Sequence, residues 1–177
     1  AAGRDAAGPA LRTLEFPDGV VLPGLVDMHA HPGPGVSRYD VDPDRHFLPR
    51  GVTTVLSQGD AGARDWPAYR RQITDHSRTR VLMALNFAAA GESNPARCFE
   101  QLEDADVEAC VRAIQAGGDA IWGIALNTSI ACIGDLDARE IMARGLEAAE
   151  RAGRPILFGS RHAPDWPLAE QIGQGVF

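Results

Sequence analysis

Short apolar runs alternate with longer amphipathic segments along this chain of 177 residues. Each run is β-branched or continuously apolar, which is typical of strands buried on both faces. The runs comprise residues 20–30, 52–57, 81–87, 120–127 and 154–159. Strands that alternate with helices form a parallel sheet through right-handed crossovers, so the carboxyl ends of all strands meet at one edge. We therefore expect an α/β fold with its functional residues at that edge.

The segments between the runs have the residue spacing of helices. Asp104 or Asp106 could cap one helix, and Gly117 with Gly118 would end it. Gly153 would end another helix in the same way. The expected helices span 65–77, 104–116 and 137–152, with a short helical turn at 42–48 and a last helix beginning near Pro167.

Composition limits the partners that we expect. The chain is 45% apolar and 23% charged, which is ordinary for a globular protein. Its net charge of −7 argues against nucleic acid, and it has no apolar run long enough for a membrane span. Three widely spaced cysteines have no metal-site or disulfide spacing, so we expect a reduced, cytoplasmic setting. All 17 basic residues are arginine, which excludes lysine chemistry.

The first apolar run ends in the segment Leu22–Gly35, which reads LPGLVDMHAHPGPG. On a strand, alternate residues share a face, so Asp27, His29 and His31 project to one side. Two imidazoles side by side at a strand end can hold a divalent metal. A pair of structural, hydrogen-bonded histidines is the competing interpretation. Asp27 is interpreted as a residue that orients a histidine or a backbone amide rather than as a ligand.

This segment resembles the first barrel strand of the amidohydrolase superfamily, in which a Pro-Gly step precedes an aspartate and His-x-His. Gly51-Val52-Thr53-Thr54-Val55 is similar to the second strand, and the end of the third run and the fourth run resemble the deacetylase and dihydroorotase-like branch. The resemblance implies a (β/α)8 TIM barrel, of which this chain holds about five β/α units. It also implies that His29 and His31 bind a divalent metal, for which zinc is expected. A metal-activated water would then hydrolyse a C–N bond of a small molecule.

Two family positions differ in this chain. The bridging lysine of binuclear members aligns with Ala125, and the fifth-strand histidine aligns with Gly159. A lysine-bridged binuclear centre is therefore excluded, whereas a mononuclear centre is compatible with the sequence. A complete barrel needs roughly 250 residues, so the sixth-strand histidine and the eighth-strand aspartate, which is the general base in relatives, would lie beyond Phe177.

Four polar residues near strand ends are candidate substrate contacts: Asp60, Asn86, Asn127 and Arg161. Asp60 lies in a Gly-rich loop, where a turn-forming role is the alternative. Asn86 and Asn127 could instead cap strand ends. Arg161 could bind a substrate carboxylate with two hydrogen bonds, although a surface arginine is the commoner outcome.

These observations lead to one primary hypothesis and two alternatives. Residues 20–177 are predicted to be part of a metal-dependent hydrolase barrel, and residues 1–19 a leader or the remnant of a small N-terminal β domain. The barrel would be completed by its remaining segments or by a homo-oligomeric partner, because open parallel edges are unpaired. The first alternative is a non-catalytic, incomplete barrel that needs another chain. The second is an open doubly wound sheet that binds a small ligand.

Overall fold

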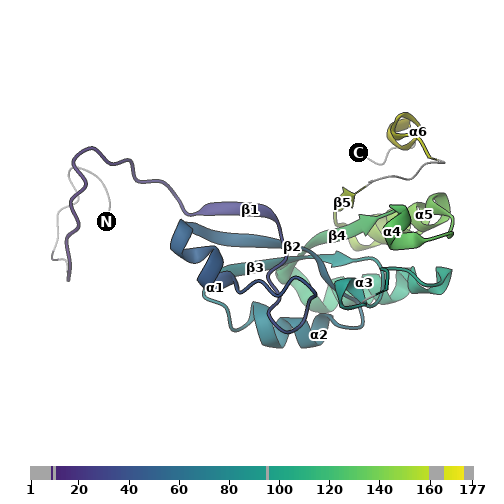
Figure 1. Ribbon diagram of the computed structural model, residues 1–177, viewed down its shortest axis with the longest axis horizontal. Helices are drawn as coiled ribbons and strands as arrows, with labels where there is room; N and C mark the ends of the chain where they lie inside the picture. The colour runs from purple at the N-terminus through teal and green to yellow at the C-terminus, as the bar shows by residue number, and fades with distance from the viewer. Residues whose placement is uncertain (1–8, 10, 95, 160–165, 174–177) are drawn as a thin grey trace.

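The computed structural model describes residue 9 and residues 11–94, 96–159 and 166–173. Its centre is a sheet of five parallel strands in the order β1-β2-β3-β4-β5 (Figure 1). The strands are β1 (Leu25–Ala30), β2 (Val52–Gly62), β3 (Arg80–Asn86), β4 (Ile121–Asn127) and β5 (Ile156–Gly159). Because consecutive strands are neighbours and all run in one direction, this is a half-barrel of the (β/α)8 type. The five predicted strands are confirmed.

Helices α2, α3 and α5 contribute buried residues to one apolar cluster against this sheet, whereas residues before β1 extend away from it (Figure 1). The α-helices are α1 (Pro43–His46), α2 (Trp66–Tyr69), α3 (Val107–Gly117), α4 (Ile130–Ile133), α5 (Ala138–Ala152) and α6 (Leu168–Gly173). Short 3₁₀ segments are η1 (Leu48–Arg50), η3 (Gly91–Ser93), η4 (Leu102–Asp104) and η5 (Gly118–Ala120), and η2 (Arg70–Thr74) is a π-helix. No helix in the described ranges is long and apolar enough to cross a membrane.

Local capping explains why most helices were predictable. The side chain of Asp106 accepts a hydrogen bond from the Ala109 amide at 2.9 Å, which begins α3. Asp137 begins α5 in the same way through the Arg139 amide at 2.8 Å, and Gly153 ends it with φ of 61°. The expectation for 65–77 was wrong in detail, because α2 passes into the π-helix η2 there. The single turn α4 was not predicted.

Each face of the sheet has its own apolar cluster. The helix-covered face carries the larger cluster, in which Met83, Leu85 and Ile124 are fully buried. The opposite, inner face has a small cluster of Leu56, Ala84 and Ala125. Strict alternation along β4 would put Trp122 on the face of Ile124 and Leu126, but it packs with the inner cluster. The reason is a register shift, since Met83 pairs with Ile121 while Ala84 pairs with Gly123.

Asp44 joins α1 to the segment before β3 and provides a test of this packing. Its carboxylate accepts hydrogen bonds from the Arg78 amide at 2.9 Å and from the amide and hydroxyl of Thr79, both at 2.8 Å. Burial alone would raise the pKa of Asp44, but these hydrogen bonds lower it below its ordinary value. Asp44 therefore stabilises the fold above its unfolded-state pKa, and this contribution is lost as pH falls through the lower folded-state pKa.

We expect Asp44→Asn to reduce the free energy of unfolding by about 1–2 kcal/mol at pH 7. The difference from wild type should shrink as the pH is lowered below about 4. Asp75→Asn is the matched control, because Asp75 is exposed and forms only a 3.5 Å surface ion pair with Arg70. Urea unfolding at several pH values measures both variants; equal losses for the two would contradict the assignment.

Candidate active site

A cavity of about 830 Å³ lies at the carboxyl ends of the strands. Its wall is built from residues at or just after the ends of β1, β3, β4 and β5, together with loop residues. The lining includes His29, His31, Arg38, Tyr39, Gln58, Asn86, Glu92, Ala125, Asn127, Ser129, Cys132 and Gly159. The structure therefore brings the two histidines and both candidate asparagines into one concave site at the predicted edge of the sheet.

His29 and His31 both face this cavity. Their ring centroids are 5.8 Å apart and the rings are inclined by 73°. Tyr39 stacks on His31 with a centroid distance of 4.0 Å and an angle of 26°, which restricts the rotation of that ring. The period of two along β1 places the rings on one side, while Met28 between them remains exposed on the other.

Asp60 lies beneath His31 rather than in a loop. It is 1% exposed, within β2, and its Oδ1 is 3.1 Å from Nδ1 of His31. The Ser57 hydroxyl donates to Oδ2 of Asp60 at 2.6 Å. Because Asp60 occupies Nδ1, the other ring nitrogen, Nε2, is the one that His31 can offer to a cavity ligand. A carboxylate behind a histidine is the usual way in which a metal-binding imidazole is oriented.

Tyr69 extends this buried polar network. Its hydroxyl donates to the carbonyl oxygen of Pro32, directly after His31, and also contacts Ser57. Burial, followed by the nearby charge of Asp60, raises the pKa of Tyr69 well above its ordinary value. Tyr69 is therefore a neutral hydrogen-bond donor that anchors the turn after β1. In the sequence, Tyr69 is only one residue of the helix expected over 65–77.

Asp27 and the two asparagines make backbone hydrogen bonds. Oδ1 of Asp27 accepts from the His29 amide at 3.0 Å, a contact of the kind expected from the sequence. Asn86 donates to the Gly59 carbonyl at 3.1 Å and accepts from the Ala88 amide at 2.9 Å. Asn127 accepts from the Ser129 amide at 2.9 Å. Both asparagines thus shape strand ends and also line the cavity, which combines the two interpretations made from the sequence.

Arg38 and Glu92 form an ion pair that sequence reasoning missed. Their side chains are 2.5 Å apart and join the loop after β1 to the 3₁₀ turn η3 across the cavity. Burial raises the pKa of Glu92, and the charges of Arg38 and His31 only partly oppose this. The sequence places each of these charged residues shortly after the end of an expected strand. It does not indicate that the two residues pair.

The two positions at which the family pattern differs also line the cavity. They are Ala125 and Gly159, neither of which has a metal-ligating side chain. In the part of the chain that the structure describes, no group of three or more His, Cys, Asp or Glu side chains could hold a metal ion. His29 and His31 therefore fit as two ligands of a metal centre and do not complete it. Arg161 lies outside the described residues.

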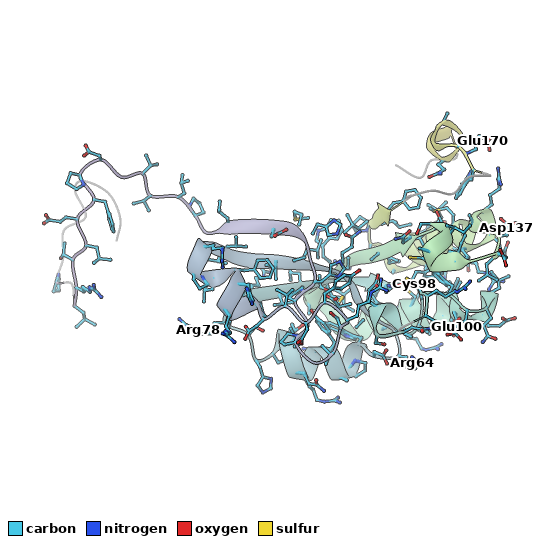
Figure 2. All side chains as sticks on the ribbon, in the orientation of Figure 1. Arg64, Arg78, Cys98, Glu100, Asp137 and Glu170 are labelled. Atoms are coloured by element: carbon cyan, nitrogen blue, oxygen red, sulfur yellow. The ribbon has the colours of Figure 1, made fainter. Side chains whose placement is uncertain are left out.

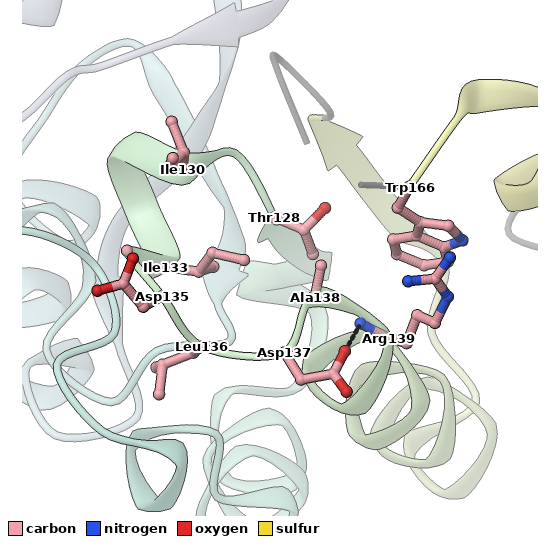
Figure 3. Close-up of a pocket in the computed structure, with 10 residues that line it drawn as sticks. Thr128, Ile130, Ile133, Asp135, Leu136, Asp137, Ala138, Arg139 and Trp166 are labelled. Carbon is pink, nitrogen blue, oxygen red and sulfur yellow. Dashed lines mark hydrogen bonds between the residues drawn. The ribbon is translucent and has the colours of Figure 1, made fainter. Parts of the chain in front are cut away.

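A second cavity of about 410 Å³ lies beside the start of α5 (Figure 3). The side chain of Asp137 caps the start of α5 by accepting a hydrogen bond from the Arg139 amide. The Arg139 guanidinium lies 5.6 Å from the centroid of the Trp166 ring. Thr128 lines this cavity and is fully buried. Ile130 lines both cavities. The candidate metal residues all belong to the larger cavity, so the smaller one is not part of the site described above.

Comparison with known proteins agrees with this architecture. No family model matches the chain. A protein of Brucella anthropi named deacetylase is 28% identical over 111 residues, which are 62% of this chain and 28% of that protein. A deacetylase of Agrobacterium fabrum is 27% identical over 111 residues, which are 62% of this chain and 27% of that protein. The chain thus spans little more than a quarter of these curated relatives.

Solved structures show the same fold at lower sequence identity. The crystal structure of an adenine deaminase has a TM-score of 0.74 at 23% identity, covering 80% of this chain and 38% of that chain. The crystal structure of a dihydroorotase has a TM-score of 0.71 at 24% identity, and the match covers 77% of this chain and 43% of that chain. The chain is thus similar in sequence to two curated deacetylases and shares its half-barrel fold with an adenine deaminase and a dihydroorotase.

Proposed function

We propose that this chain supplies the first two metal ligands of a hydrolase that cleaves a C–N bond in a small molecule. The observation that carries the proposal is the placement of His29 and His31 in one cavity at the strand ends of an amidohydrolase-type half-barrel. The cavity volume of about 830 Å³ is within the usual range for small-molecule sites. The relatives support the bond type, since they are named as deacetylases, a deaminase and a dihydroorotase.

His29 and His31 would hold a divalent ion, and zinc is the proposed ion because it is readily bound by imidazole. When bound, such an ion lowers the pKa of water toward neutrality and polarises a substrate carbonyl. Asp60 fixes the orientation of His31, Tyr39 covers one face of its ring, and Asp27 holds the His29 amide. Asn86, Asn127 and Arg38 present polar groups to the substrate from the cavity wall, and Arg161 is a further proposed contact.

The proposal includes a partner for the open edges. β1 and β5 each pair with one strand within the described sheet, so each has an unpaired edge. The remaining barrel segments, or a second copy of the chain, would cover these edges and supply the other ligands. We place this enzyme in the cytoplasm on account of its reduced cysteines. The alternative is a non-catalytic barrel, and the zinc measurement described next distinguishes it from the hydrolase.

We expect His29→Ala and His31→Ala each to lower bound zinc by at least about tenfold, because loss of one imidazole removes a ligand. His46→Ala is the matched control, since His46 is exposed in α1 and outside the cavity. Elemental analysis after dialysis against limiting zinc measures the metal content, and hydrolysis of N-acylated amino acids and cyclic amides measures activity. Wild-type protein with zinc only at trace level would contradict the proposal and favour the non-catalytic barrel.

A further inference from the structure

Two cysteines that are far apart in the sequence lie close together, and one of them, Cys132, lines the large cavity. Cys98 is in the loop after η3, and Cys132 is in α4. The Phe99 amide donates to the Cys132 carbonyl at 2.9 Å, and the Arg97 guanidinium packs against the α-carbon of Gly134. The interaction between the two thiols is the largest influence on the pKa of each. Because Cys98 directly precedes Phe99 in the chain, this backbone hydrogen bond brings Cys98 close to Cys132, as a disulfide requires.

The two thiols have different surroundings. Both residues are 6% exposed, but Cys132 lines the large cavity and is therefore open to small solutes that enter it. The hydrogen bond from Cys98, despite opposing burial, lowers the pKa of Cys132 to about 7, with help from the Ser129 hydroxyl. The same hydrogen bond, together with burial, raises the pKa of Cys98. Cys98 lies toward the middle of the molecule, unlike the charged side chains labelled at its periphery (Figure 2).

We propose that Cys98 and Cys132 form a reversible dithiol–disulfide site that reacts with a peroxide entering the cavity. The Cys132 thiolate attacks one peroxide oxygen, which forms a sulfenic acid and releases water or an alcohol. The Cys98 sulfur then attacks the Cys132 sulfur, the S–O bond breaks, and a second water leaves. Two thiols lose two electrons and two protons, and the peroxide is reduced. This site goes beyond the proposed hydrolase and does not depend on a metal.

Cys110 is an internal control for this proposal. It is 1% exposed, lies on the core-facing side of α3 and does not line the cavity. Burial raises the pKa of Cys110 to about 12. A thiol that is buried and protonated in this way is inert toward oxidants. Peroxide should therefore oxidise Cys98 and Cys132 and leave Cys110 as a thiol.

The disulfide would alter the cavity that it borders. Sγ of Cys98 lies 4.0 Å from Oε1 of Glu92, whose carboxylate pairs with Arg38. Oxidation removes this thiol donor and ties the loop carrying Cys98 covalently to α4. We therefore expect oxidation to change the Arg38–Glu92 side of the cavity and to leave the His31–Asp60 pair in place.

The test treats the reduced, purified protein with hydrogen peroxide and maps it by mass spectrometry without reductant. The expected result is a loss of about 2 Da, a peptide pair joined through Cys98 and Cys132, and full reversal by dithiothreitol. Cys110→Ser should behave like wild type. Cys98→Ser should accumulate a sulfenic acid that dimedone traps at Cys132, and Cys132→Ser should show no rapid dimedone labelling at Cys98.

A measurement on the wild-type protein covers the case in which a variant fails to fold. Iodoacetamide at pH 7 should modify Cys132 at least about tenfold faster than Cys110, because only the thiolate reacts. The proposal is overturned if peroxide produces no Cys98–Cys132 link, if the link forms only between molecules, or if Cys110 is oxidised as fast as Cys132.

Discussion

The Asp60→Asn substitution is expected to weaken zinc binding by about 10–100-fold while the protein remains folded. Asp60 is the partner that fixes His31: its Oδ1 is 3.1 Å from Nδ1, and the carboxylate is fully enclosed with the Ser57 hydroxyl at 2.6 Å. An asparagine keeps the volume but removes the charge that makes His31 a stronger ligand. It also presents an amide N–H₂ where one of the two oxygens stood. Chelator competition measures the zinc affinity.

Asp135→Asn is the matched control for this prediction. Asp135 is an exposed aspartate that lines the smaller cavity, so the same chemical change there should leave zinc affinity unchanged. Circular dichroism establishes whether each variant is folded, and ¹⁵N NMR of the imidazole reports which nitrogen of His31 carries the proton. A folded Asp60→Asn protein that binds zinc as tightly as wild type would remove Asp60 from the site.

Gly62→Ala is expected to destabilise the protein by about 3 kcal/mol. A Cβ at position 62 would overlap the carbonyl oxygen of Ala88 and lie 2.5 Å from the carbonyl carbon of Ala89. Both obstacles are backbone, so no side-chain rotation relieves them. The same contact holds the loop that carries Glu92, because Gly91, with φ of 58°, packs against Ala61 and Gly62. We therefore expect Gly62→Ala to weaken the Arg38–Glu92 ion pair as well.

Thermal unfolding tests this prediction, with an expected fall in midpoint of roughly 6–12 °C. Gly51→Ala is the control: Gly51 has φ of 80°, but a Cβ there meets nothing within 4 Å. Gly51→Ala should lower the free energy of unfolding by about 1 kcal/mol, because only the left-handed backbone conformation opposes the substitution. The close packing of the end of β2 against the loop after β3 would be contradicted if the two alanine variants had equal midpoints.

Features that depend on neighbouring residues could be predicted from the sequence. Asp106, Asp137 and Gly153 bound their helices because capping uses groups a few residues apart. Strand periodicity correctly placed His29 and His31 on one face. Strict alternation along β4 would put Trp122 on the wrong face, because it ignores a register shift between β3 and β4. The expected loop at Asp60 was also wrong, since β2 continues to Gly62.

Local sequence patterns predict the parallel α/β class, the strands, the capped helices and the two histidines at the end of β1. The contacts of the site arise from the packed sheet, because Asp60 is 29 residues from His31 in the chain and Arg38 meets Glu92 from a separate loop. Such pairs depend on strand register and on local backbone features such as Gly59, with φ of 80° before Asp60. One residue of register moves a side chain to the opposite face, so residues distant in sequence become partners only through the packed sheet.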